Sequence, residues 1–125
     1  MGIDFDGGLT CTLGVSDLDR SIDWYVEMLG FTLLYRVDEI GWCELSTAVD
    51  NVAMGLSQVE SVSIGGGVTP TFGTRDIEAA KADLDSKDVE QDGPIQDVPG
   101  LVRLLTFYDP DGNPLMLYQD MRDAE

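Results

Sequence analysis

Residues 9–31 read LTCTLGVSDLDRSIDWYVEMLGF and carry the strongest structural signals in the chain. Leu9–Val15 consists largely of β-forming residues in partial alternation, which predicts a strand. The pair Ser16–Asp17 supplies a helix N-cap, and Gly30 stands where a left-handed C-terminal cap is expected. Between the caps, apolar residues recur at the spacing of one helix face: Leu18, Ile22, Tyr25 and Leu29. The stretch therefore predicts a strand followed directly by an amphipathic helix.

Further strands are predicted after this helix, and then the same order of elements begins again. Phe31–Val37, Trp42–Thr47 and Val52–Val59 are strand candidates separated by turn residues. The second half offers a helix that begins after Asp76, with these strand candidates around it: Val68–Thr74, Ile95–Val98, Val102–Tyr108 and Leu115–Gln119. Each half thus reads strand, helix, strand, strand, strand.

Two alignments support a repeat. Val15–Asp19 matches Thr74–Glu78 at an offset of 59 residues, and Gly55–Gln58 matches Met116–Gln119 at an offset of 61. A nearly constant offset with one element order predicts two copies of a βαβββ unit.

The predicted organisation is one structural domain of the α+β class, built from two modules. Residues 1–64 form the N-terminal module and residues 65–125 the C-terminal module, with a glycine-rich linker at Ser61–Gly67. Units of this size bury too little apolar surface alone. We therefore expect them to lie in tandem as a curved, open mixed sheet with a concave ligand pocket.

The composition excludes several classes of function. Seven basic against 24 acidic residues give a formal charge of −17, which repels nucleic acid and anionic membranes. Histidine is absent, so mechanisms that need an imidazole, either as a base or as a metal ligand, are excluded. The acid excess is typical either of an ordinary soluble acidic protein or of one from a high-salt environment, and an acidic cleft would favour cationic ligands.

Cysteine usage and hydropathy predict the compartment. Cys11 and Cys43 lie in apolar contexts and lack CxxC spacing, so reduced thiols are expected. Residues 1–8 carry two aspartates and no apolar run, and no stretch approaches the ~20 apolar residues of a membrane span. These features predict a cytoplasmic protein whose partners include neither nucleic acid nor membrane.

Four motifs resemble a known superfamily. LGVSDLDRSIDWYVEMLGFTLL at 13–34 and GWCELST at 41–47 look like the first module of the vicinal oxygen chelate superfamily. TRDIEAAKADL at 74–84 and FYDPDGNPLMLYQ at 107–119 resemble its second module. This superfamily includes glyoxalase-like, bleomycin-resistance-like and extradiol-dioxygenase-like proteins. The resemblance implies the glyoxalase/bleomycin resistance/dihydroxybiphenyl dioxygenase fold and a homodimer.

In metal-dependent members of that superfamily, a His or Gln of each first strand and a Glu of each last strand hold a divalent ion. The resemblance carries these positions onto Thr10, Thr69, Met116 and either Met54 or Gly55. Hydroxyl, thioether and glycine cannot replace imidazole and carboxylate for the usual ions. We therefore expect no cofactor, and a divalent metal only at a non-standard site.

Alternation along the strands nominates side chains that face the pocket. Glu44 is either an inward carboxylate able to act as a base or a solvent-facing strand residue. Arg103 either clamps an anionic ligand or pairs with surplus acids. Trp42, Phe107 and Tyr118 either stack a planar ligand or pack in the core. The candidates that line the pocket are Thr10, Thr12, Trp42, Glu44, Thr69, Thr71, Arg103, Phe107, Met116 and Tyr118.

Two functions stay open at this point. The first is a metal-independent protein that binds or sequesters a small organic ligand in the pocket. The alternative is a divalent-metal-dependent glyoxalase- or dioxygenase-like enzyme with displaced carboxylate ligands such as Glu44. The lack of histidine and of the usual metal ligands favours the first, and no catalytic residue is assigned.

Overall fold

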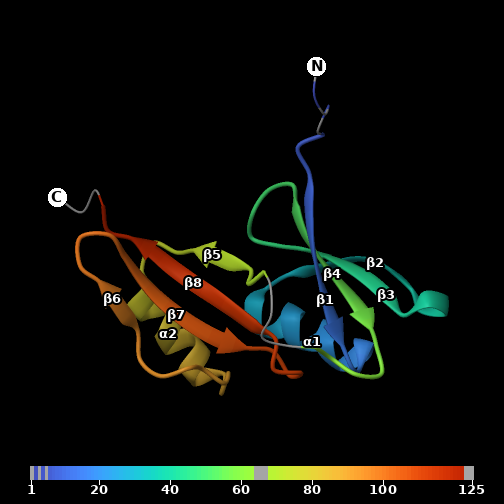
Figure 1. Cartoon of the computed structure of the whole chain (residues 1–125). Helices are drawn as coiled ribbons and strands as arrows, with labels where there is room; N and C mark the ends of the chain where they lie inside the picture. The colour runs from blue at the N-terminus through green and yellow to red at the C-terminus, as the bar shows by residue number, and fades with distance from the viewer. Residues whose placement is uncertain (1, 3, 5, 64–67, 123–125) are drawn as a thin grey trace. The chain divides into compact units, whose positions relative to one another are not determined.

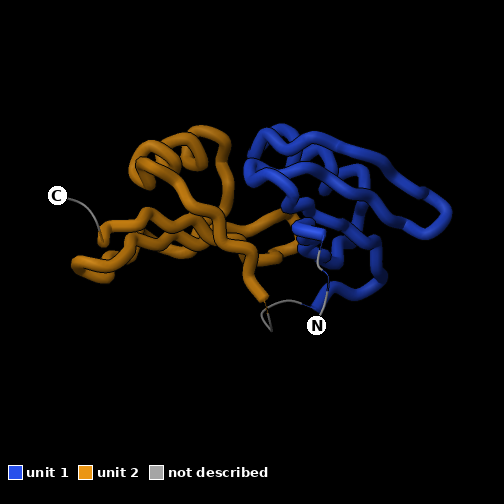
Figure 2. Tube along the Cα trace, turned by 90° about the horizontal axis from the view of Figure 1, so that it is seen from above, with its two compact units in different colours: residues 1–63 blue, residues 64–125 orange. Residues whose placement is uncertain are grey.

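Two compact units make up the chain, residues 1–63 and 64–125, in a computed structural model that describes residues 2, 4, 6–63 and 68–122 (Figures 1 and 2). Each unit has a four-stranded mixed sheet with one α-helix, and the two element orders are the same. The tandem α+β fold predicted from the repeat is therefore confirmed. The predicted linker glycines Gly65–Gly67 lie outside the described residues.

The first unit places its helix over one face of the sheet. Its elements are β1 (Leu9–Val15), α1 (Leu18–Leu29), β2 (Thr32–Val37), a 3-10 turn at Asp38–Ile40, β3 (Trp42–Ser46) and β4 (Val52–Gln58). The strand order is β1-β4-β3-β2, with β1 parallel to β4 and the other pairs antiparallel. The core combines the apolar stripe of α1 with alternate strand residues, including Leu18, Ile22, Tyr25, Cys43, Leu45, Met54 and Leu56.

The second unit repeats this arrangement. Its elements are β5 (Thr71–Gly73), α2 (Ile77–Ser86), β6 (Gln96–Val98), β7 (Val102–Tyr108) and β8 (Pro114–Asp120). The strand order is β5-β8-β7-β6, again with only the first pair parallel. The first strand is shorter than the predicted Val68–Thr74, because Pro70 has no N–H to donate to a sheet ladder.

The repeat extends to the hydrogen bonds that begin each helix. Asp17 accepts from the Arg20 N–H and Asp76 from the Ala79 N–H, both at 3.1 Å. Gln58 Oε1 accepts from the Leu18 N–H and Gln119 Oε1 from the Ile77 N–H, both at 2.8 Å. A glutamine at the end of β4, or one residue before the end of β8, thus accepts from a free N–H donor at the start of the helix in the same unit.

These glutamines give a direct stability prediction. Gln119→Ala leaves the Ile77 N–H without its acceptor, so we expect unfolding free energy to fall by about 1 kcal/mol. Gln119→Glu is the matched control, because it keeps the acceptor and adds a negative charge that a helix N-terminus favours. Urea denaturation of both variants checks the prediction. Equal losses in the alanine and glutamate variants would contradict it.

Candidate functional site

The face of the first sheet that α1 leaves uncovered carries small and hydroxyl side chains. Alternation assigns this face, since Met54 and Leu56 on the other side are fully buried. Two rows of paired residues cross it: Thr10–Ala53–Ser46 and Thr12–Gly55–Glu44. The predicted candidates Thr10, Thr12, Trp42 and Glu44 therefore share one face of the first unit.

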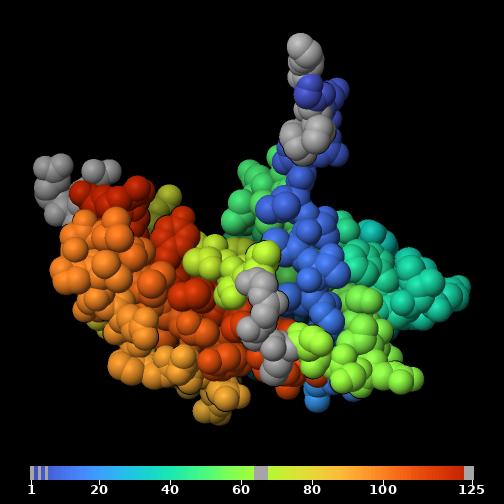
Figure 3. Space-filling view, in the orientation of Figure 1, coloured from blue at the N-terminus to red at the C-terminus, as the bar shows by residue number. Residues whose placement is uncertain are grey.

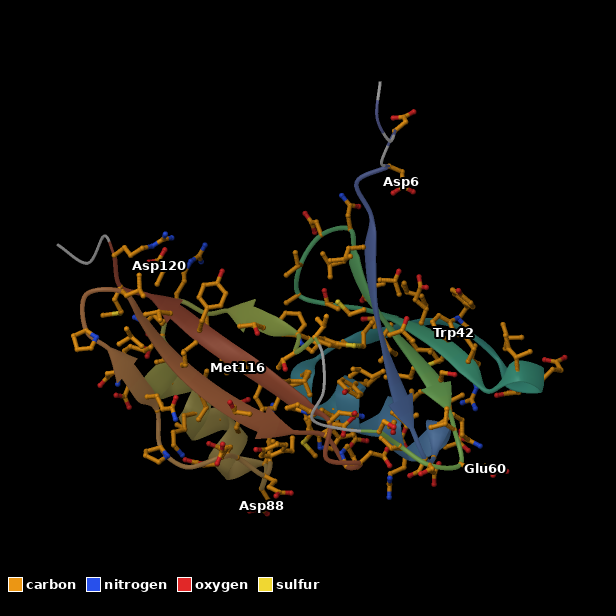
Figure 4. All side chains as sticks on the ribbon, viewed as in Figure 1. Asp6, Trp42, Glu60, Asp88, Met116 and Asp120 are labelled. Carbon is orange, nitrogen blue, oxygen red and sulfur yellow. The ribbon has the colours of Figure 1, made fainter. Side chains whose placement is uncertain are left out.

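An aromatic and acidic cluster stands out on this face. Trp42 Nε1 donates to Tyr35 Oη at 3.2 Å, and Tyr35 Oη donates to Glu44 Oε1 over a longer 3.4 Å. The Trp42 ring lies against Gly55, because a Cβ added there would lie 2.9 Å from Cζ2 and would overlap the ring edge. Figure 4 labels Trp42 at its place on β3. The absence of a side chain at position 55 lets the edge of the indole ring approach the backbone of β4.

An irregularity in β2 adds two residues to the face. Leu33 pairs with Leu45 and Tyr35 with Glu44, so Leu34 is an extra residue at a β-bulge. Leu34 and Glu44 line the same hollow. Sequence reasoning missed both Leu34 and Tyr35, because a bulge reverses the alternation without a strong local signal.

The hollow of the first unit has a volume of about 520 Å³. Glu44 lies on its wall, and the apolar residues that line it are Leu9, Leu34, Val49, Val52 and Ala53. The other polar residues that line it are Asp6, Thr10, Ser46, Thr47, Asp50 and Asn51, and Gly8 completes the wall. This volume falls in the range of small-molecule sites.

The second unit has a related uncovered face. In Figure 1 α2 lies behind β7 and β8, so the uncovered face of that sheet is the one seen there and in Figure 3. Thr71, Met116 and Thr106 form one paired row, and Gly73 pairs with Tyr118 in the next. The Tyr118 ring lies over Gly73, where an added Cβ would come within 2.9 Å of Cζ. Each unit thus has one aromatic ring resting on a glycine of a neighbouring strand.

Two predicted residues lie on the opposite face and are corrected. Arg103 donates to Glu78 on α2 at 2.8 Å and to Asp97 on β6 at 2.6 Å, so it faces the helix. These hydrogen bonds, the one to Glu78 foremost, raise the pKa of Arg103 above its ordinary value. Phe107 has the same parity on β7 and is 1% exposed. Arg103 therefore pairs with surplus acids, and Phe107 packs in the core.

Two further predictions concern Thr69 and the cysteines. Thr69 precedes β5 instead of lying in the ladder, and its carbonyl accepts from Thr71 Oγ1 at 3.0 Å. Both cysteines are free thiols, with Cys43 buried and Cys11 partly exposed. Burial raises the pKa of the Cys43 thiol, which makes it a poor nucleophile.

The residues at the superfamily's metal positions do not fit a divalent ion. Gly55 pairs with Thr12 and Met116 with Thr71, so Gly55, and not the buried Met54, is the counterpart of Met116. At these positions the first unit offers only the hydroxyl of Thr10, and the second unit offers the hydroxyl of Thr69 and the thioether of Met116. These donors are poorly suited to hard and borderline ions. Within 2, 4, 6–63 and 68–122, no three Cys, Asp or Glu residues lie together as a metal-binding group.

The fold defines a class of small α+β proteins in which two βαβββ units follow each other and no helix covers one face of each sheet. A family model described as Glyoxalase/Bleomycin resistance protein/Dioxygenase superfamily matches residues 9–117. The chain therefore belongs to this superfamily.

Solved structures agree with this assignment. TnmS3, an antibiotic binding protein from Streptomyces sp. CB03234, is 28% identical, with 96% of this chain and 98% of that chain covered and a TM-score of 0.77. A superfamily member from Sphaerobacter thermophilus DSM 20745 is 26% identical, with 94% and 98% covered and a TM-score of 0.79. A glyoxalase/bleomycin resistance protein from Streptomyces sp. CB03234 is 29% identical, with 90% and 99% covered and a TM-score of 0.71.

None of the curated proteins matches the sequence. Among the described helices, none has the length and apolarity to cross a membrane.

Proposed function

We propose that the protein binds or sequesters a small organic molecule with a planar ring, without metal chemistry. The observation that carries this proposal is the pair of rings resting on glycines, Trp42 on Gly55 and Tyr118 on Gly73. A ring held against a sheet is fixed in place for contact with a ligand, and offset stacking contributes about 0.5–1.5 kcal/mol beyond area burial. The similarity to an antibiotic binding protein at 28% identity supports the same function.

Ligand-induced stabilisation tests the proposal. We would measure the melting temperature with planar aromatic compounds of either charge and, separately, with Mn²⁺, Ni²⁺ and Zn²⁺. A ligand at 100 times its Kd stabilises the folded state by about 2.7 kcal/mol. We expect stabilisation by at least one ring compound. Stabilisation by metal ions alone, or near-stoichiometric divalent metal in the purified protein, would overturn the proposal and favour the metal-dependent enzyme.

We infer further that the protein acts as a homodimer in the cytoplasm. The resemblance to the superfamily supports the dimer, and the strongly acidic composition without a long apolar run supports the compartment. Light scattering tests the first statement, with twice the chain mass as the expected result.

A further inference from the structure

The hydrogen bonds around Glu44 all run in one direction. Trp42 Nε1 donates to Tyr35 Oη, and Tyr35 Oη donates to Glu44 Oε1. The last group of this chain is a carboxylate, which when ionised accepts hydrogen bonds and donates none. Its bond to Tyr35 is long at 3.4 Å, so most of its acceptor capacity remains for another group.

The described residues that line the hollow bring no positive charge to Glu44. Asp6 and Asp50 line the same hollow, and no lysine or arginine does. Asp6 accepts from the Gly8 N–H at 2.9 Å, which orders the carboxylate without neutralising it. Within the described part of the chain, the lysines and arginines that form ion pairs do so with other carboxylates and not with Glu44.

The volume and the apolar wall of the hollow set a second requirement for the ligand. Its volume of about 520 Å³ suits a ligand of a few fused rings, and Leu34 and Ala53 give it an apolar wall. The Trp42 and Tyr35 rings do not line the hollow, but they adjoin its wall at Glu44 through the hydrogen bonds described above. Such rings attract a cation as well as a planar ring, through the negative face of the aromatic system. Glu44 therefore lies both on the wall of the hollow and beside the aromatic pair.

We propose that the hollow and the adjoining Trp42–Tyr35 pair together form a site that selects a planar aromatic cation, with Glu44 between them as the counter-ion and the ring pair as the aromatic contact. The proposal rests on the proposed function and narrows its ligand class. It assigns the charge selectivity to one side chain, whereas a general effect of the −17 charge would not depend on position.

Two three-ring compounds of opposite charge test it by calorimetric titration: proflavine, a cation, and anthracene-9-carboxylate, an anion. We expect proflavine to bind more tightly. We expect Glu44→Gln to weaken proflavine about tenfold and to leave the anion unchanged or slightly tighter, since the variant removes charge but keeps shape.

Glu39→Gln is the matched control. Glu39 is exposed in the 3-10 turn Asp38–Ile40 of the same unit, does not line the hollow, and its replacement removes the same charge. Titrations at 0.15 M and 1 M KCl separate contact from long-range attraction, because ~1 M salt screens charges beyond ~3 Å. The contact effect of Glu44→Gln should persist in high salt.

Each outcome has a distinct meaning. Equal weakening by the Glu39 and Glu44 variants would overturn the inference, since net charge alone would then explain it. Equal affinity for proflavine and the anion would also overturn it but would leave the proposed function standing. Binding of neither compound would contradict the proposed function itself for planar ligands. Circular dichroism of each variant confirms that it is folded.

Discussion

Gly55→Ala is expected to weaken proflavine binding about 30-fold, or ~2 kcal/mol, the size of a central binding contact. A Cβ at position 55 would overlap the edge of the Trp42 ring, so the indole has to leave the sheet. Its Nε1 would then lose the hydrogen bond to Tyr35, and the ring contact beside Glu44 would be disrupted. The expected loss exceeds that of Glu44→Gln because the change moves a ring and breaks the cluster.

Gly14→Ala is the control for Gly55→Ala. Gly14 also lies in a strand of the first sheet without positive φ, and its added Cβ would contact only a Val59 methyl at 3.3 Å. We expect its affinity for proflavine to stay within about twofold of the parent. Trp42 emission, isolated in a Trp24→Phe background, reports the displacement directly. Unchanged emission and affinity in Gly55→Ala would show that the Trp42 ring is not part of the site.

The parts of the fold that depend on local chemistry could be predicted from the sequence. Asp17 caps α1 and Gly30 ends it with φ at +75°, as the cap and left-handed positions indicated. β1 and β7 have the predicted bounds, Leu9–Val15 and Val102–Tyr108. These features require only that each residue suit its own backbone conformation and its immediate neighbours.

The parts of the site that depend on strand register were harder to predict. The sequence leaves Phe107 either as a pocket candidate or in the core, and its parity with the helix-facing Arg103 places it in the core. Tyr35 joins Glu44 on the open face only because the bulge at Leu34 shifts the register of β2. The sequence identifies Gly55 only as an absent metal ligand, because its contact with Trp42 depends on the pairing between β3 and β4.

A second large effect is expected from salt. We expect the melting temperature at pH 7 to rise on the order of 10 °C between 0.1 M and 2 M KCl, because screening reduces self-repulsion among the acidic side chains. The formal charge is −17, and only seven basic residues are present to pair with 24 acids. The ion pairs that do form, such as Lys81–Asp85 and Arg36–Asp38, involve exposed carboxylates and contribute little.

The pH dependence of this salt effect distinguishes charge screening from a general strengthening of apolar burial by salt. The sequence pI is about 4.1, so the net charge nearly vanishes at pH 4 and the KCl effect should shrink to a few degrees.

Hydrogen bonds from Arg122 lower the pKa of Asp120 to about 2. A carboxylate with a depressed folded pKa stabilises the native state above its unfolded pKa, and that contribution disappears as the pH falls towards 2. The Asp120–Arg122 pair therefore stays largely ionised at pH 4 and does not confound the control. A melting temperature that is flat in KCl at pH 7 would rule out adaptation to high salt, whereas an equal rise at both pH values would assign the effect to apolar burial.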